Sequence, residues 1–307
     1  MVRRLCIVGL GLMGGAAGLA ARRTGAALQV VGVANRSETI EKARRLGAVD
    51  EATLDLAAGV RDADLVLIAV PLRAVVEVAR GLLPHCRQGA VITDVSSCKA
   101  RIVPAIENLI SRRRDAAHFV GSHPLAGSEK SGLDAAPEVQ LAGALCLLTP
   151  SADGEAYQTV DGFWKALGMK TLRISPEEHD AHLARSSHLP HLVAFALIAA
   201  QTERSLSLSG SGLRDMTRLA GSDVRLWSEV FAANAAHVSR AARELGEELV
   251  RLSQEVQALG FPDAETARER LFRYLADAKQ RHEARFPSVE SGAEPSPPPP
   301  PPAIPPA

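Results

Sequence analysis

Apolar and polar positions alternate in two different ways along this chain. Up to residue 175, short apolar runs typical of buried strands alternate with longer amphipathic segments typical of helices. The expected strands cover 5–8, 29–34, 64–70, 89–95, 118–120, 143–148 and 169–174, and the expected helices cover 15–23, 37–46, 72–83, 101–114 and 157–167. This order predicts right-handed crossovers and therefore an α/β fold with a doubly wound parallel sheet.

The pattern becomes helical after Pro176. A helix opens over 177–180 with two acidic residues, and Pro190 is expected to kink it because proline lacks a backbone N–H. A heptad seam, with spacings of 4, 3, 4 and 3 residues, is formed by Leu245, Leu249, Leu252, Val256 and Leu259. The seam predicts a helix packed along a partner, which is either another part of this chain or a second subunit. A last amphipathic helix is expected from 262 to 286.

The first strand runs directly into a glycine-rich turn. Gly9, Gly11 and Gly14, with Leu12 and Met13 among them, give the G-x-G-x-x-G spacing between a strand and a helix. In this turn the first glycine permits the bend, the second lets a pyrophosphate approach the backbone, and the third lets the helix pack on the strand. The helix N-terminus then offers free N–H groups to phosphate. The turn predicts a dinucleotide site.

The ends of two further strands complete the expected cofactor site. Val70 and Pro71 follow the strand over 64–70, at the same edge of a parallel sheet. Asn35 ends the second strand, where an acidic residue would favour NAD, and Arg36 follows with a guanidinium that suits a 2′-phosphate. We therefore expect NAD(P), with a preference for NADP. The alternative is that Arg36 stacks on adenine and NAD is accepted.

A polar loop after the strand over 118–120 is the strongest candidate for chemistry. Residues 121–132 contain a histidine, His123, together with hydroxyls, a carboxylate, an ammonium and three glycines. A loop at the carboxyl end of a strand is where open α/β sheets hold their ligands. The alternative is a polar turn with a solvent-facing histidine.

Composition narrows the class of protein. Lys+Arg and Asp+Glu number 35 each in 307 residues, so no global field favours nucleic acid or an anionic membrane. The four cysteines are widely spaced, which is typical of reduced thiols in a cytoplasmic protein. No apolar run approaches the ~20 residues of a membrane span. No metal site is expected. The proline-rich tail over 287–307 cannot build a core and is expected to be disordered.

Several segments together resemble one enzyme family. They are Gly-Leu-Gly-Leu-Met-Gly at 9–14, Asp-Val-Ser-Ser-Cys-Lys at 94–99, Gly-Ser-His-Pro-Leu-Ala-Gly at 121–127, His-Asp at 179–180, Ser-His-Leu-Pro-His at 187–191 and Arg-Asp-Met-Thr-Arg at 214–218. In order and spacing, over residues 3–286, the chain resembles prephenate dehydrogenases and their arogenate-using relatives. The histidine loop and the 214–218 segment are the specific parts, because many dehydrogenases share the glycine turn.

The resemblance implies an oxidative decarboxylation in tyrosine biosynthesis. Prephenate would lose a hydride to NAD(P)+ and its ring carboxylate as carbon dioxide, giving 4-hydroxyphenylpyruvate; arogenate, giving tyrosine, is the alternative substrate. His123 would take the hydroxyl proton, since a neutral imidazole suits pH 7. Ser97 would orient that imidazole and touch the same hydroxyl. The resemblance also implies a dinucleotide-binding domain over 1–175 and a helical substrate-binding and dimerisation domain over 176–286, hence a homodimer.

The resemblance implies that several charged residues bind the anionic substrate. Arg218 matches the family's carboxylate binder, and Arg214 stands where a basic residue is usual. Glu129 and Asp215 match a pair that forms an ionic gate with Arg218. The alternative for Arg214 is a solvated pair with Asp215.

Aromatic residues would line the same pocket. His179, His191 and Trp227 match lining positions. For His188 and His182 the alternative is a core or helix-surface imidazole, and this interpretation is favoured for His182. The alternatives are that His191 satisfies a backbone carbonyl at the kink and that Trp227 only packs between helices.

Two departures and two rival functions accompany the resemblance. Ser96 stands where the family has glycine, and Asn35 replaces the acid common in NAD-using members. A β-hydroxyacid dehydrogenase or imine reductase would need a lysine on the helical part, and none lies between Lys170 and Lys279. A dinucleotide-binding sensor without turnover is the rival that is not an enzyme.

Overall fold

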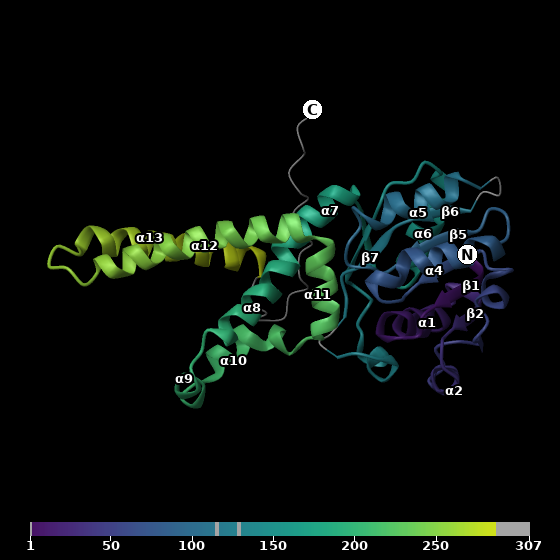
Figure 1. The fold of residues 1–307 in the computed structure, drawn as a ribbon, viewed down its shortest axis with the longest axis horizontal. Coiled ribbons are helices and arrows are strands. Elements are labelled where there is room, and N and C mark those ends of the chain that lie inside the picture. The colour runs from purple at the N-terminus through teal and green to yellow at the C-terminus, as the bar shows by residue number, and fades with distance from the viewer. Residues whose placement is uncertain (1, 114–116, 128–129, 287–307) are drawn as a thin grey trace. The chain divides into compact units, whose positions relative to one another are not determined.

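The computed structural model describes residues 2–113, 117–127 and 130–286 (Figure 1). It divides into two compact units, Met1–Ala241 and Ala242–Ala307. The strands are β1 (Val2–Val8), β2 (Ala27–Val33), β3 (Glu51–Thr53), β4 (Leu65–Ile68), β5 (Val91–Asp94), β6 (His118–Val120), β7 (Ser122–Pro124), β8 (Leu145–Leu148) and β9 (Lys170–Arg173).

The helices of the described residues are α1 (Leu12–Thr24), α2 (Ser37–Arg45), α3 (Leu56–Val60), α4 (Val75–Leu82), α5 (Ile102–Ser111), α6 (Gly154–Ala166), α7 (Pro176–Leu183), α8 (Leu189–Ala199), α9 (Glu203–Ser207), α10 (Ser211–Thr217), α11 (Val224–Ala233), α12 (Ala235–Ala258) and α13 (Glu265–Arg285). Shorter turns of helix are η1 (Leu72–Ala74), η2 (Leu83–His85), η3 (Leu133–Glu138), η4 (Ala184–His188) and η5 (Arg218–Gly221).

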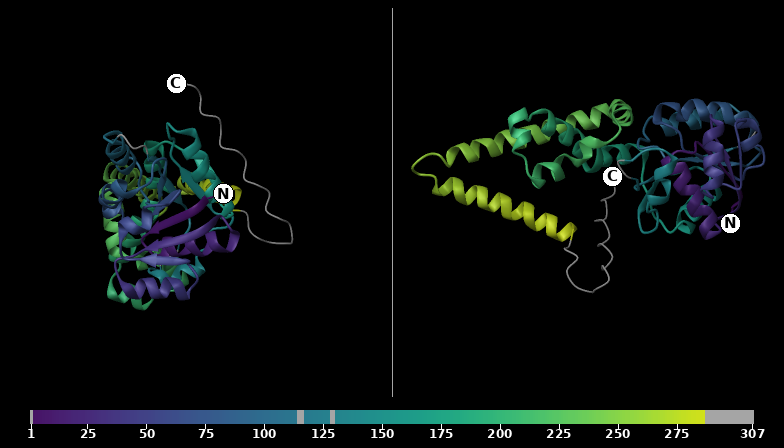
Figure 2. Two further views of the ribbon diagram at one scale, coloured as in Figure 1. Left: turned by 90° about the vertical axis from the view of Figure 1, so that its right-hand side faces the viewer. Right: turned by 90° about the horizontal axis from the view of Figure 1, so that it is seen from below.

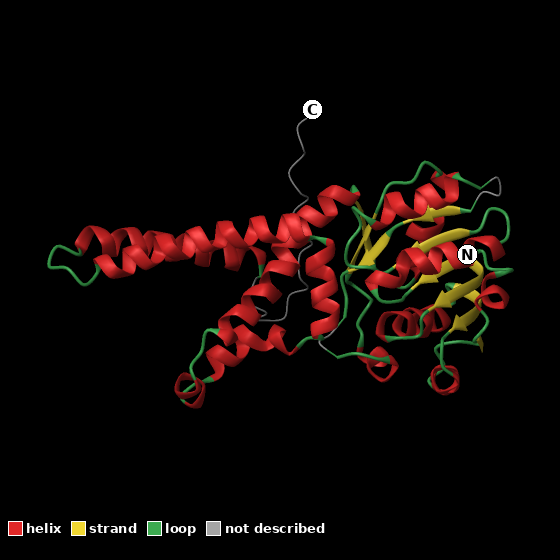
Figure 3. Cartoon of the chain, in the orientation of Figure 1, coloured by secondary structure: helices red, strands yellow, loops and turns green. Residues whose placement is uncertain are grey.

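A six-stranded parallel sheet forms the first layer of the nucleotide-binding part. Its order is β3-β2-β1-β4-β5-β6, and helices cover it (Figure 3). All four residues of β4 are buried, as expected of a strand with both faces covered. The doubly wound fold is confirmed. The strand order reverses between β1 and β4, so the carboxyl ends of these two strands open the crevice in which such sheets hold ligands.

A second, three-stranded sheet corrects part of the prediction. The strands expected over 143–148 and 169–174 do not extend the parallel sheet, because β8 and β9 pair with β7 instead. β7 lies in the segment expected to be a loop and pairs antiparallel with β8, with His123 opposite Leu147. Side chains alternate along a strand, so Ser122 and Pro124 are buried while His123 faces the other side and stays half-exposed.

Hydrogen bonds centred on Asp94 join the two sheets. The buried Asp94, at the end of β5, accepts from the Ser122 N–H at 3.1 Å, and its carbonyl accepts from the Ser122 hydroxyl at 2.5 Å. Trp164 on α6 donates its indole N–H to the same hydroxyl at 2.9 Å. Lys99, also fully buried, donates to the Asp94 carboxylate at 2.6 Å. These bonds fix the start of β7 and therefore the position of His123.

The helical segment of the first unit begins where it was expected. Ser175 caps α7 in a reciprocal capping box with Glu178. The expected kink at Pro190 takes the form of a wide π-helical turn, η4, after which α8 begins with Pro190 in its first turn. The π-helical turn lies between His179 and His191, two of the expected site residues.

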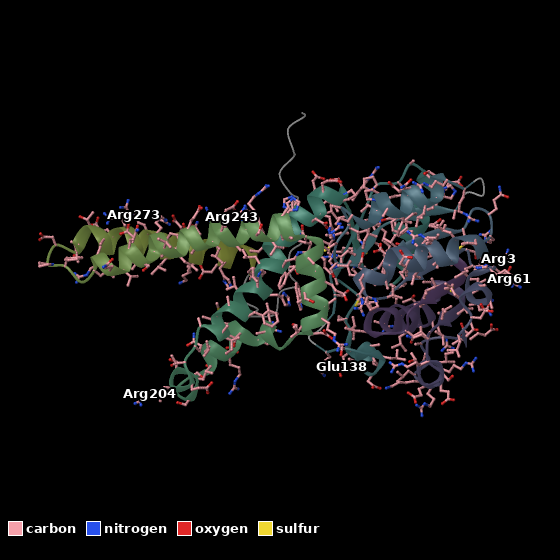
Figure 4. The ribbon with its side chains drawn as sticks, in the orientation of Figure 1. Arg3, Arg61, Glu138, Arg204, Arg243 and Arg273 are labelled. Carbon is pink, nitrogen blue, oxygen red and sulfur yellow. The ribbon has the colours of Figure 1, made fainter. Side chains whose placement is uncertain are left out.

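The second unit contains the C-terminal part of α12, a turn and α13 (Figure 2). Glu255 pairs with Arg270 at 2.9 Å across the two helices. Arg243 and Arg273 point outward from the ribbon (Figure 4). Two positions of the heptad seam, Leu249 and Val256, are more than half exposed, and α13 exposes its own apolar residues Phe272 and Leu275.

No described helix is both long enough and apolar enough to cross a membrane.

The buried Lys99–Asp94 pair generates a stability prediction. Lys99→Met leaves the Asp94 carboxylate uncompensated inside the protein, so the free energy of unfolding should fall by about 3–5 kcal/mol. The control is Lys165→Met, because Lys165 forms a 2.8 Å pair with Asp161 but is 59% exposed. Its loss should cost about 1 kcal/mol or less. Urea unfolding of both variants measures the difference, and equal losses would contradict the assignment of Lys99 as a buried counter-ion.

Candidate active site

The glycine turn after β1 leaves room for a ligand at one position. Gly9 has a φ of 101°, and a Cβ there would lie 2.4 Å from the Ala69 carbonyl oxygen. A Cβ on Gly14 would lie 1.9 Å from the Gly9 oxygen. A Cβ on Gly11 would meet no atom of the protein within 4 Å. The first and third glycines are therefore required by the fold, while the second opens onto empty space.

The surroundings of this space fit a dinucleotide. Gly11 is the N-cap of α1 and contributes no side-chain cap, so the N–H groups of Leu12 and Met13 are available to a pyrophosphate. Val70, after β4, lies against Gly9, with Pro71 next to it. Asn35 and Arg36 are exposed at the carboxyl end of β2, at the edge of the sheet where the ribose of a dinucleotide lies in this fold.

The structure places His123 next to a second histidine. Its Nδ1 lies 2.9 Å from Nε2 of His179, which comes from α7. Nδ1 of His179 lies 2.8 Å from the Asp180 carboxylate. His179 is 1% exposed and both of its ring nitrogens have partners within the protein, so it lies behind His123. This position differs from the expectation that His179 lines the substrate pocket.

Both imidazoles are neutral at pH 7. Burial lowers the pKa of His123 well below its usual value, and repulsion from His179, Lys99 and His188 adds to the effect. Burial also lowers the pKa of His179, although the hydrogen bond to Asp180 opposes that shift. A neutral imidazole that keeps part of its surface exposed can accept a proton from a bound substrate.

A second group of expected residues lies on α8, α11 and η5. The rings of His191 and Trp227 stack at 3.5 Å with an interplanar angle of 20°. His191 Nδ1 donates to the Ser187 carbonyl at 3.0 Å, which is the backbone contact that the alternative for this residue expects. The Arg218 guanidinium is close enough to contribute to a lowered pKa of His191, after burial and against the hydrogen bond to Ser187. Ring contacts at 6.0 Å link Trp227 to His188.

The other expected site residues lie on the segment after β5 and on α10, or outside the described residues. Ser97 is half-buried on the segment that follows β5, and the hydrogen-bond partner of His123 Nδ1 is His179. Arg214 and Asp215 are exposed on α10. Glu129 lies outside the described residues, as does the proline-rich tail.

Several buried polar residues were not singled out from the sequence. Asp180 accepts from the backbone N–H groups of Lys99 and Ala100, at 2.8 and 3.0 Å. Asn234 donates to the Asp180 carbonyl at 2.7 Å and lies 3.2 Å from Nδ1 of His188. The charged residues in the 94–99 and 179–180 segments were the available signal, but their partners are distant in sequence. Among the described residues, no His, Cys, Asp or Glu group is arranged to hold a metal ion.

Comparison with known proteins identifies the family. The sequence model "Prephenate dehydrogenase, nucleotide-binding domain" matches residues 17–173, and "Prephenate dehydrogenase, dimerization domain" matches residues 175–277. The chain belongs to the prephenate dehydrogenase family. The prephenate dehydrogenase of Bacillus subtilis is 31% identical over 305 residues, which is 95% of this chain and 78% of that protein. The cyclohexadienyl dehydrogenase of Zymomonas mobilis is 34% identical over 245 residues, which is 76% of this chain and 81% of that protein.

A solved structure agrees with the family in fold. The crystal structure of prephenate dehydrogenase from A. aeolicus, in complex with hydroxyphenyl propionate and NAD+, matches with a TM-score of 0.80 at 32% identity. The match covers 92% of this chain and 98% of that one. The resemblance predicted from the sequence is confirmed, and the chain is an NAD(P)-dependent oxidoreductase. The matches favour neither rival function.

The glycine turn generates a paired prediction. Gly11→Ala adds a methyl group where the protein has no atom, so the free energy of unfolding should fall by only about 1 kcal/mol or less, because alanine is a poorer helix N-cap than glycine. The same methyl group occupies the space for the pyrophosphate, so the Kd for the nicotinamide cofactor should rise about tenfold or more. Gly14→Ala should instead destabilise the fold, because its Cβ collides with the Gly9 backbone. Thermal unfolding and cofactor titration measure both quantities; unchanged cofactor affinity in Gly11→Ala would contradict the site.

Proposed function

We propose that this protein catalyses the NAD(P)-dependent oxidative decarboxylation of prephenate to 4-hydroxyphenylpyruvate. The observation that carries the proposal is His123, a neutral and partly exposed imidazole on β7, the strand that follows β6, in a chain whose glycine turn leaves room for a dinucleotide. The family match supports the substrate class. The bound nicotinamide supplies the hydride acceptor.

The residues of the chain act on the substrate around that acceptor. His123 takes the proton of the ring hydroxyl as hydride leaves the carbon that carries this hydroxyl. Ser97 contacts the same hydroxyl. Departure of the ring carboxylate as carbon dioxide then makes the ring aromatic. Arg218 binds a substrate carboxylate, for which a guanidinium offers paired donors. His191 and Trp227 form one apolar wall of the pocket, supported by their stacked rings and by the proximity of Arg218.

We also propose a preference for NADP over NAD. Its support is the exposed Arg36 at the end of β2 together with the neutral Asn35 beside it. A guanidinium can pair with a 2′-phosphate, whereas no carboxylate stands at the position that would bind the ribose hydroxyl.

The assay combines each substrate with each cofactor. Purified protein should reduce NADP+ in the presence of prephenate, with a higher kcat/KM than with NAD+, and absorbance of the reduced cofactor measures turnover. A higher kcat/KM with arogenate would assign the alternative substrate. Absence of turnover with both substrates and both cofactors would contradict the proposed function.

Two variants separate catalysis from binding. His123→Asn should lower kcat by about 10²-fold or more, the usual contribution of a general base. Arg218→Ala should mainly raise KM, by about tenfold or more, because it removes a charge-assisted hydrogen bond that holds the substrate. Arg204→Ala, an exposed arginine on α9, is the matched control and should change neither constant. An unchanged KM in Arg218→Ala would refute the carboxylate assignment.

We further propose that the chain forms a homodimer through its helical part. The dimerisation-domain match over 175–277 supports this, as do the exposed apolar side chains Leu249, Val256, Phe272 and Leu275. A second copy would remove these side chains from water.

Sedimentation equilibrium tests the dimer. The wild type should sediment at twice the mass of the chain, and Leu249→Asp combined with Phe272→Asp should shift it toward monomer because charges would then be buried at the interface. Leu28→Asp is the control, since Leu28 is 70% exposed on β2 in the other unit. A monomeric wild type would overturn the proposal.

A further inference from the structure

A continuous line of hydrogen-bonding groups ends at His123. The Asp180 carboxylate accepts from the N–H groups of Lys99 and Ala100 and lies 2.8 Å from Nδ1 of His179. Nε2 of His179 then lies 2.9 Å from Nδ1 of His123. Asp180 and His179 are each 1% exposed, so water does not compete for these bonds.

The Asp180 carboxylate, at the far end of this line from His123, can only accept hydrogen bonds. Burial raises the pKa of the Asp180 carboxyl, but hydrogen bonds from His179, Lys99 and Ala100 outweigh that effect and the pKa lies below its ordinary value. Asp180 is therefore an unprotonated carboxylate at pH 7. A carboxylate has no proton to donate, so the proton in the His179–Asp180 hydrogen bond belongs to Nδ1 of His179.

The proton on Nδ1 of His179 determines which ring nitrogen of His123 carries a proton. A neutral imidazole carries one N–H, so His179 with its proton on Nδ1 presents a lone pair on Nε2. The contact with His123 is then a hydrogen bond only if Nδ1 of His123 carries a proton and donates it. His123, being neutral, is left with a lone pair on Nε2. A general base needs such a lone pair, whereas the opposite tautomer would present an N–H to the substrate.

We propose that Asp180, acting through His179, holds His123 in the Nδ1–H tautomer and so leaves its Nε2 free to take the substrate proton. Asp180 and His179 are positioning residues and do not touch the substrate. The proposal rests on the proposed function for its catalytic consequence, but the tautomer itself is a property of the protein without substrate.

The same carboxylate also fixes the segment that carries Ser97. The two N–H groups that Asp180 accepts from belong to Lys99 and Ala100, which follow Ser97 closely in sequence. Asp180 therefore sets the orientation of the base and the position of the neighbouring hydroxyl together. Since Asp180 belongs to α7 and the segment follows β5, the geometry needed for proton transfer exists only when α7 packs against that edge of the sheet.

The first experiment measures the tautomer directly. Protein labelled with ¹⁵N-histidine gives distinct long-range ¹H–¹⁵N correlation patterns for the Nδ1–H and Nε2–H tautomers, and the signal of His123 is assigned by its loss in His123→Asn. At about pH 7.5, where an ordinary imidazole is mostly neutral, the wild type without ligands should show His123 as the Nδ1–H tautomer. An Nε2–H tautomer would overturn the proposal whatever the enzyme's activity.

The second experiment removes the acceptor. His179→Leu should convert His123 to a mixture of tautomers and lower kcat by about tenfold or more, while KM changes by less than about twofold because no substrate contact is lost. His179→Gln places an amide oxygen near the position of Nε2 and should restore both the tautomer and most of kcat. His182→Leu, on the exposed face of the same helix, is the control and should match the wild type.

These outcomes separate the two claims. An Nδ1–H tautomer in a protein that does not oxidise prephenate or arogenate would refute the proposed function and leave the positioning claim standing. Full kcat in His179→Leu, in a variant that unfolds at the wild-type temperature, would refute the positioning role. Equal loss of kcat in the Leu and Gln variants would also contradict it, since only the Leu variant lacks an acceptor.

Discussion

The structure depends on the ion pair between Lys99 and Asp94, both of which are completely buried. Removing two charges from water is unfavourable by several kcal/mol per ion, so the pair adds little stability compared with apolar residues of the same size. It does, however, fix positions, because each charge must keep its partners. Asp94 holds Ser122, and Ser122 precedes His123; Lys99 holds the segment after β5 and offers its own N–H to Asp180.

One charged centre therefore orders groups that come from distant parts of the chain. The parallel sheet provides Asp94, the second sheet provides His123, and α7 provides His179 and Asp180. None of these elements alone brings an imidazole, its orienting partner and a cofactor space together. The positive charge of Lys99 also contributes to the lowered pKa of His123, after burial and repulsion from His179. The network that positions the histidine thus also helps to keep it neutral.

The sequence predicted the features that depend on residues close together in the chain. The glycine turn could be predicted because its three glycines, the strand before it and the helix after it lie within a few residues of one another. β7 was missed because its three residues lie among glycine and proline, and its pairing with β8 involves residues more than twenty positions away. The contact of His123 with His179 spans 56 positions, and neither residue carries a sequence signal for the other. The resemblance identified both histidines, but it assigned His179 to the pocket wall, whereas in the structure His179 is buried and both of its ring nitrogens have partners within the protein.

The same network accommodates Ser96, the serine that stands where the family has glycine. A serine in place of the family's glycine adds a buried hydroxyl next to Ser97, where an unsatisfied polar group would be unfavourable. In the structure that hydroxyl donates to the Asp94 carboxylate and lies 2.9 Å from the Lys99 ammonium, and Ser96 is 7% exposed. The added hydroxyl is therefore hydrogen-bonded within the buried ion pair. Ser97, the next residue along the chain, remains half-buried.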